Sequence, residues 1–186
     1  MIDSYPSHLT IEIDRVRLRK FLCMRSLIAW ATVFTLFGGL FGFVAFAKAM
    51  EAAENSGLSG GAAAICGALA LMKSIGISSV LALLAFFIFS FRSDTRTARN
   101  LEVTIEGSFL RVRQFAHSMT DRKLHFRSIV DYTTYQDSLM RRCGIHSLQM
   151  TTIGGGPTST VMIPGVKDCL KVRDMLSEID HLRENE

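Results

Sequence analysis

Residues 26–47 are SLIAWATVFTLFGGLFGFVAFA, and residues 74–91 are SIGISSVLALLAFFIFSF. Neither run contains a charged residue. At about 1.5 Å of rise per residue, helices of these lengths cross or nearly cross a hydrocarbon layer roughly 30 Å thick. A helix this long in the core of a soluble protein would carry charge on its outward face. The two runs therefore predict a transmembrane hairpin, with spans at about 26–47 and 72–91.

Positive charge gathers at the ends of the two runs that lie away from their connection. The basic residues before the first run and after the second are Arg15, Arg17, Arg19, Lys20, Arg25, Arg92, Arg96 and Arg99. The connection holds only Lys48 and Lys73, which Glu51 and Glu54 balance. Because loops rich in arginine and lysine stay in the cytoplasm, we expect both termini to be cytoplasmic and residues 48–73 to lie outside.

The hairpin divides the 186 residues into three parts. Residues 1–25 form a basic cytoplasmic lead-in, residues 26–91 the hairpin, and residues 92–186 a small cytoplasmic domain. The last part holds 14 Lys and Arg against 12 Asp and Glu. A nucleic-acid-binding domain would show a clustered basic face instead, so we expect no nucleic-acid partner.

The lead-in allows two interpretations. Ile11 and Ile13, followed by residues 15–19, alternate between apolar and polar side chains, which is a strand period rather than a helical one. The simpler interpretation is a positively charged run-in to the first span. The other is a short strand or interfacial segment that docks onto the C-terminal domain.

Small residues repeat along both helices of the predicted hairpin. In the first span, Gly38, Gly42 and Ala45 form one stripe, which would let a second helix approach closely. No turn separates residues 62–72 from the second span, so we expect that helix to extend outward to about residue 62. Its outer part is lined by Ala64, Gly67 and Ala68, and an apolar surface there favours a packing partner.

After Arg92 the hydrophobic pattern changes to a period of two, which is typical of strands. Turns are expected at residues 106–108 and 117–121, and a loop at 154–157. From Lys167 to about residue 182 the period is helical. The expected strand segments are 101–105, 109–115, one starting at 124–126, 129–136, 148–152 and 160–163. The pattern predicts an α+β protein, in which six or seven antiparallel strands form a bent sheet or barrel that the C-terminal helix caps.

The segments Arg127–Val130, Gln136–Leu148, Thr152–Gly155 and Ile163–Val166, with two spans in front, resemble the bacterial pleckstrin-homology-like (PH-like) family of membrane proteins. The resemblance covers about residues 100–182. It implies a PH-like domain, a place in the bacterial inner membrane and no assigned activity. Its motif positions, all structural in character, are Leu139, Arg142, Gly144, Gly154 and Gly165.

No constellation of residues predicts catalysis. His117, His125 and His146 are scattered, and the glycine-rich loop at 154–157 lacks the lysine and the following helix of a phosphate-binding loop. The four cysteines have no metal-binding spacing. We therefore expect no enzyme activity, no cofactor and no metal.

Two functions stay open at this point. The first is a non-catalytic, membrane-anchored interaction module, an accessory or assembly subunit that binds other membrane proteins in a larger inner-membrane complex. The alternative is a binder of anionic lipid headgroups, or a membrane-stress factor, that acts through a basic juxtamembrane face. The candidate lipid contacts are Arg92, Arg96, Arg99, Arg111 and Arg113.

Overall fold

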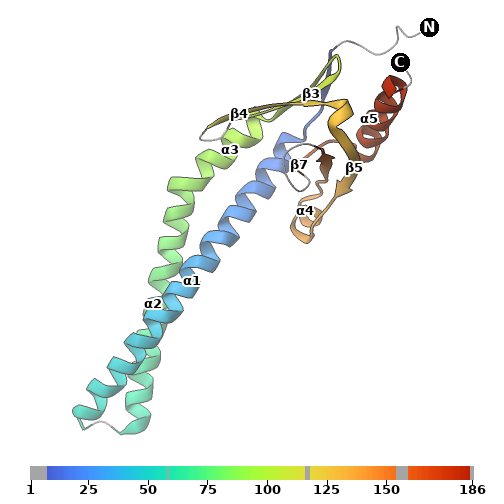
Figure 1. Ribbon diagram of the computed structural model, residues 1–186. Coiled ribbons are helices and arrows are strands. Elements are labelled where there is room, and N and C mark those ends of the chain that lie inside the picture. Colours follow the sequence, from blue (N-terminus) through green and yellow to red (C-terminus); the bar gives the residue numbers. More distant parts are fainter. Residues whose placement is uncertain (1–7, 58, 116–117, 154–158, 185–186) are drawn as a thin grey trace. The chain divides into compact units, whose positions relative to one another are not determined.

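The computed structural model describes residues 8–57, 59–115, 118–153 and 159–184. The chain forms two compact units (Figure 1). One unit is Met24–Arg92, and the other combines Met1–Cys23 with Ser93–Glu186. The fold is α+β, with two long apolar helices in a hairpin, then antiparallel sheets and a C-terminal helix, as the sequence predicts.

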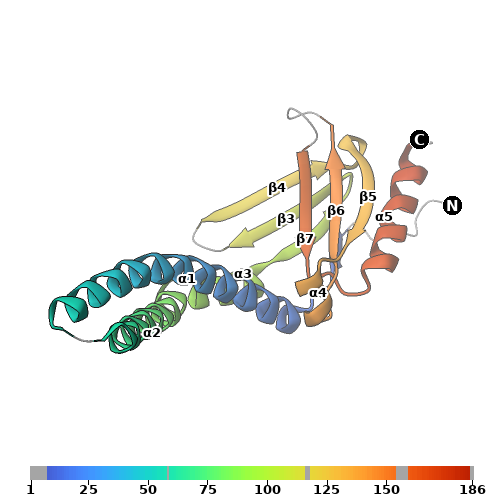
Figure 2. The same cartoon turned by 90° about the horizontal axis from the view of Figure 1, so that it is seen from below.

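Two long helical stretches lie side by side in the hairpin unit (Figures 1 and 2). Helix α1 covers Arg15–Asn55. The second stretch consists of α2 (Gly60–Ala85), a π-helical turn (Phe86–Ser90) and α3 (Phe91–Asn100). Both stretches are long and apolar enough to cross a membrane, by length and composition.

A four-stranded antiparallel sheet has the strand order β1-β2-β3-β4. The strands are β1 (His8–Ile11), β2 (Glu102–Glu106), β3 (Phe109–Phe115) and β4 (Met119–His125). Alternate side chains such as Val103, Ile105 and Leu110 are buried. The register pairs Ile105 with Leu110 and Leu110 with Leu124, so one face of the sheet is apolar and the other is polar.

A second antiparallel sheet consists of β5 (Ile129–Tyr135), β6 (Ser147–Thr152) and β7 (Ser159–Pro164), in that order. A 3-10 turn, Phe126–Ser128, precedes β5, and the short helix α4 (Ser138–Cys143) connects β5 to β6. Helix α5 (Cys169–Glu184) packs against β5 and β6 (Figure 2). The core between them includes Leu148, Met150, Ile163 and Leu176, all buried.

The lead-in is part of the C-terminal unit. Strand β1 pairs with β2, and Ile13 forms a β-bridge with Val166. The Asp14 N–H donates to the Gly165 carbonyl at 2.8 Å, and the side chain of Leu18 is fully buried. The docking-strand interpretation is therefore right for residues 8–11. The alternation through residues 15–19 is misleading, because those residues begin α1.

One local prediction is wrong. The turn expected at 117–121 is largely strand, since β4 starts at Met119. Strand β4 lies at the edge of its sheet, and five of its seven side chains are exposed, so it lacks the apolar alternation that marks a strand. The segment between β5 and β6, for which the periodicity predicts no strand, holds the short helix α4.

Candidate functional site

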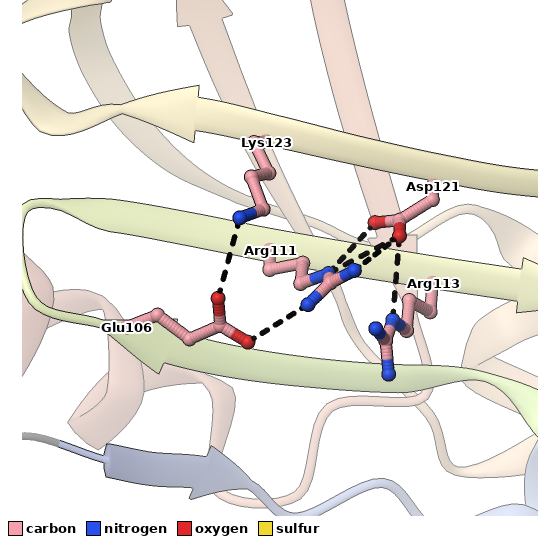
Figure 3. A network of polar contacts seen from close by, with 5 residues as sticks. All are labelled: Glu106, Arg111, Arg113, Asp121 and Lys123. Carbon is pink, nitrogen blue, oxygen red and sulfur yellow. Dashed lines mark hydrogen bonds and ion pairs between the residues drawn. The ribbon is translucent and has the colours of Figure 1, made fainter.

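An ion-pair network covers the polar face of the four-stranded sheet (Figure 3). Arg111 donates from Nη2 to Asp121 at 2.6 Å and from Nη1 to Glu106 at 3.1 Å. Arg113 reaches Asp121 through Nε at 3.4 Å, and Lys123 reaches Glu106 at 3.6 Å. Three cations therefore share two carboxylates across β2, β3 and β4.

The charges in this network stabilise one another. The hydrogen bond from Arg111 lowers the pKa of Asp121 from 3.8 to about 2, against the opposing effect of desolvation. The hydrogen bonds to Asp121 and Glu106 raise the pKa of Arg111 above its usual range. Arg111 and Arg113, two of the predicted lipid contacts, thus hold carboxylates of their own sheet.

We expect Asp121→Asn to reduce the dependence of stability on acidic pH. Because the pKa of Asp121 is lowered, its ionised form stabilises the fold above pH 3.8, and this contribution is lost as the pH falls through about 2. The wild-type melting temperature should fall more steeply than that of the variant between about pH 4 and pH 2. Thermal melts of the full chain in detergent measure this slope.

Asp131→Asn is the matched control, since it removes an exposed carboxylate from the other sheet. Equal slopes for wild type and Asp121→Asn would contradict a stabilising role of the network.

The other three predicted lipid contacts lie on or beside α3. Arg92, Arg96 and Arg99 are all exposed. Arg99 and Arg113 meet Arg15, the first residue of α1, in the lining of a pocket of about 320 Å³. Sequence patterns predicted neither this pocket nor the part that Arg15 has in it.

Two motif glycines connect the start of α1 to the C-terminal domain. Gly144 ends α4 with φ of 66° and ψ of 35°, and its carbonyl accepts a hydrogen bond from Arg17 Nη1 at 3.1 Å. Gly165 has φ of 79°, and a Cβ there would lie 3.0 Å from Leu18 Cβ. At Gly165 the absence of a side chain lets the first turn of α1 approach the turn after β7, whereas at Gly144 it is the positive φ that favours glycine.

The other motif residues have different roles. Leu139 is half-buried, whereas Met140, next to it, is buried and donates its N–H to Asp137 Oδ1 at 2.6 Å. Arg142 is exposed, and Gly154 lies outside the described residues.

A second pocket, of about 530 Å³, lies beside the turns that contain Gly144 and Gly165 and is lined by Asp14, Arg17, 144–146 and 165–171. Its basic side chains are already paired, for example Lys167 with Glu12 at 2.8 Å.

The predicted helix-packing residues fall into two groups. Gly38, Gly42 and Gly67 are buried. A Cβ at Gly38 would clash with Ser78, one at Gly42 would lie 3.4 Å from Ser74 Cβ, and one at Gly67 would lie 2.6 Å from the Phe46 ring. Ala45 is half-buried, while Ala64 and Ala68 are exposed. Hydrogen bonds from Ser74 Oγ to the Gly38 carbonyl (3.1 Å) and from Trp30 Nε1 to Ser90 Oγ (2.8 Å) also join the two helices.

The second sheet presents a different kind of surface. The side chains that alternate away from its core include Thr133, Gln149 and Met162, which are neighbours across the three strands. We call this surface the β5–β7 outer face. The three strands contain a single charged residue, Asp131, and both Tyr135 and Met162 are exposed. Strand periodicity could have revealed this face, but none of its residues is of a reactive type that would mark a functional site.

No reactive cluster occurs within the described ranges. No group of three His, Cys, Asp or Glu residues there could hold a metal ion. His125 Nδ1 accepts the Arg127 N–H at 3.2 Å, and its ring contacts Phe109 edge-on. Burial raises the pKa of the Cys169 thiol. His117 lies outside the described residues.

Comparison with known proteins gives one result. The family described as Bacterial PH domain matches residues 27–179, which cover most of the hairpin and residues 93–179 of the C-terminal unit. No curated protein and no solved structure matches the chain significantly.

Proposed function

The chain belongs to the bacterial PH domain family, and from this premise we propose that it is a non-catalytic, membrane-anchored interaction module. It serves as an accessory or assembly subunit of a larger protein complex in the bacterial inner membrane. Its partners are other membrane proteins, and both of its termini are cytoplasmic.

The surface of the hairpin supports the membrane anchor. Large apolar side chains are exposed along both helices, and soluble monomeric proteins rarely expose apolar patches this large. Examples are Phe37, Leu40, Phe41, Phe43, Ile77, Val80, Phe87 and Phe89. Lipid would cover these side chains. The positive residues that flank both runs support the cytoplasmic placement of the termini.

The β5–β7 outer face is the observation that carries the interaction role. The two sheets differ in what they offer to a partner. The four-stranded sheet covers its polar face with internal ion pairs, which would have to be desolvated on binding. The β5–β7 outer face is almost uncharged and carries tyrosine and methionine, which are enriched in protein interfaces, among hydroxyl and amide groups that can form hydrogen bonds. A partner surface that is itself uncharged and partly apolar would fit it.

Lipid-headgroup binding through the basic juxtamembrane face is the alternative function. Arg111 donates from both of its terminal nitrogens to carboxylates of its own sheet, and Arg113 contacts Asp121 through Nε, so Arg92, Arg96 and Arg99 are the predicted lipid contacts that lie outside the network. The arginines therefore support lipid binding less strongly than the β5–β7 outer face supports an interaction role.

We expect Met162→Lys to release the partners. The substitution places a charge at the middle of the β5–β7 outer face, where a bound partner would have to desolvate it. Because Met162 is 45% exposed, the variant should still fold. The wild-type full chain, extracted in mild detergent, should carry a membrane protein in near-stoichiometric amount. Quantitative mass spectrometry should find recovery of that protein reduced about tenfold in the variant.

Thr10→Lys is the matched control, since it adds the same charge at an exposed position of the other sheet. It should leave recovery unchanged. A monomeric wild-type protein, or equal losses in the two variants, would rule out this docking surface.

A further inference from the structure

Strand β7 is the least protected strand edge in the described part of the chain. Both sheets are open, so β1, β4, β5 and β7 are all edge strands (Figure 2). Proteins blunt such edges with short strands, charges or bulges, because an unpaired row of N–H and C=O groups recruits another strand. Strand β1 has only four residues, β4 is charged at each of residues 121–123, and β5 has a bulge between Ile129 and Asp131. Strand β7 has six residues, no charge and a regular register with β6.

The backbone groups of Thr160 and Met162 point toward the free edge of β7. The Gly165 N–H donates to the His146 carbonyl at 2.9 Å, on the side of β6. Backbone groups alternate in direction along a strand, so the residues of β7 in phase with Gly165 bond to β6, and Thr160 and Met162 face the other way. Within the described ranges, no backbone hydrogen bond from another segment reaches these two residues, and both are exposed.

We propose that two copies of this chain pair along β7, antiparallel, around a two-fold axis that passes between their Val161 residues. In this register Thr160 of each copy lies opposite Met162 of the other. Residues of such a pair exchange both of their N–H···O bonds. Two pairs therefore form four hydrogen bonds, which satisfy every group that Thr160 and Met162 present at the edge. Because each copy contributes the same surface, the contact is isologous, as in a C2 dimer.

Charge favours a second copy as the occupant of this edge. A strand that pairs with itself brings like residues close together across the seam, and like charges there are destabilising. Strand β7 has no charged residue, whereas β4 has three in a row. The β-branched side chains of Thr160, Val161 and Ile163 also suit an extended strand. Of the long edges in the described ranges, β7 is thus the one that accepts its own copy without repulsion.

The seam is short, which limits its strength in solution. Just beyond Pro164, which has no N–H, the lead-in closes the edge through the bridge between Ile13 and Val166. A contact of this length buries less surface than a stable dimer usually needs. Here the inference rests on the proposed membrane anchor, which gives the copies one orientation and raises their effective concentration. The pairing is therefore expected in the membrane.

Disulfide trapping in isolated membranes tests the register. Chains with Thr160→Cys and chains with Met162→Cys, each with its own tag, are co-expressed after Cys23 and Cys66 are changed to serine. Opposite residues of a hydrogen-bonded pair have Cα atoms about 5.5 Å apart, which is within reach of a disulfide. Copper phenanthroline should thus join the two tags covalently. Thr133→Cys in place of Thr160→Cys is the matched control, because Thr133 is exposed but lies on β5, at the far edge of the sheet.

A backbone variant tests the hydrogen bonds. Thr160→Pro removes an N–H that β6 does not use, and edge strands tolerate proline at such positions. Two of the four seam bonds are lost, so the association constant should fall about tenfold or more. Thr160→Val keeps the N–H and should dimerise like the wild type. Photobleaching steps of the labelled full chain, at low density in phosphatidylcholine vesicles, count the dimers.

Covalent joining of the predicted pair but not of the control pair, with loss of dimers in Thr160→Pro alone, supports the seam. A monomeric wild-type chain in vesicles, equal joining of both cysteine pairs, or a Thr160→Pro variant that dimerises like the wild type overturns it. If Thr160→Pro does not fold, the cysteine pairs decide. The docking role is tested by recovery of a different protein, so the seam and that role can fail separately.

Discussion

Replacing Gly165 with alanine is expected to lower the free energy of unfolding by about 2–4 kcal/mol. Two effects add at this position. A φ of 79° is unfavourable for any residue with a Cβ, and the new methyl group would lie 3.0 Å from Leu18 Cβ. Leu18 is fully buried, and the Gly165 backbone is held on both sides, by Asp14 N–H at 2.8 Å and by the His146 carbonyl at 2.9 Å. Neither partner can move away without breaking the contact between α1 and the domain.

Gly107→Ala separates these two effects. Gly107 also has a positive φ, of 54°, but a Cβ there has nothing within 4 Å. The control should therefore lose only the backbone term, about 1 kcal/mol. The change in the unfolded chain, which loses one glycine in each variant, is the same and cancels. Chemical denaturation of the full chain in detergent measures both values. Equal losses of unfolding free energy in the two variants would show that the packing of Leu18 does not require a glycine at position 165.

Replacing Gly38 with leucine is expected to destabilise the hairpin by about 1–3 kcal/mol or more. A Cβ at this position would clash with Ser78 Oγ and would lie 2.7 Å from Ser78 Cβ. Rotation of the serine relieves the first clash but not the second, so the two helices must separate. Separation also weakens the hydrogen bond from Ser74 Oγ to the Gly38 carbonyl. Interhelical hydrogen bonds of this kind contribute to helix association in membranes.

The neighbouring glycine provides the control. Gly39→Leu makes the same change in hydrophobicity at nearly the same depth, and a Cβ at Gly39 has nothing within 4 Å. Gly42→Leu should be intermediate, because its nearest contact is 3.4 Å from Ser74 Cβ. Unfolding in mixed micelles of increasing dodecyl sulfate fraction ranks the three variants. If Gly38→Leu and Gly39→Leu unfold together, the small-residue stripe does not face the second helix.

Both predictions concern a glycine whose backbone lies close to a side chain of another segment, Leu18 at Gly165 and Ser78 at Gly38. In the hairpin, glycine lets two apolar helices pack where lipid supplies no hydrophobic force between them. In the C-terminal unit, glycine lets the first turn of α1 pack against the turn after β7. The same first turn supplies Arg15 to the pocket of about 320 Å³, and Arg17, which donates a hydrogen bond to the Gly144 carbonyl. The first turn of α1 is therefore part of the packing of the C-terminal unit.

The sequence by itself determined the two apolar helices, most of the strands and the C-terminal helix. These features follow from local periodicity, because a buried stripe repeats every 3.6 residues in a helix and every second residue in a strand. The edge strand β4 was partly missed for the same reason, since few of its side chains are buried. Residues 15–19 alternate between basic and apolar side chains, yet they are helical, so this alternation does not reflect a strand.

Only the tertiary structure decided which distant residues meet. The pairing of β1 with β2 joins segments more than ninety residues apart, and no local pattern specifies that partner. Likewise, Arg111 and Arg113 resembled free cations in the sequence, and strand register placed Asp121 and Glu106 beside them. Arg15, Arg99 and Arg113 form a pocket because two helices and a sheet bring them to one place. The repeat of apolar side chains along a helix or strand is a local property. Which charges pair, and which distant residues line one pocket, depends on long-range packing and strand register.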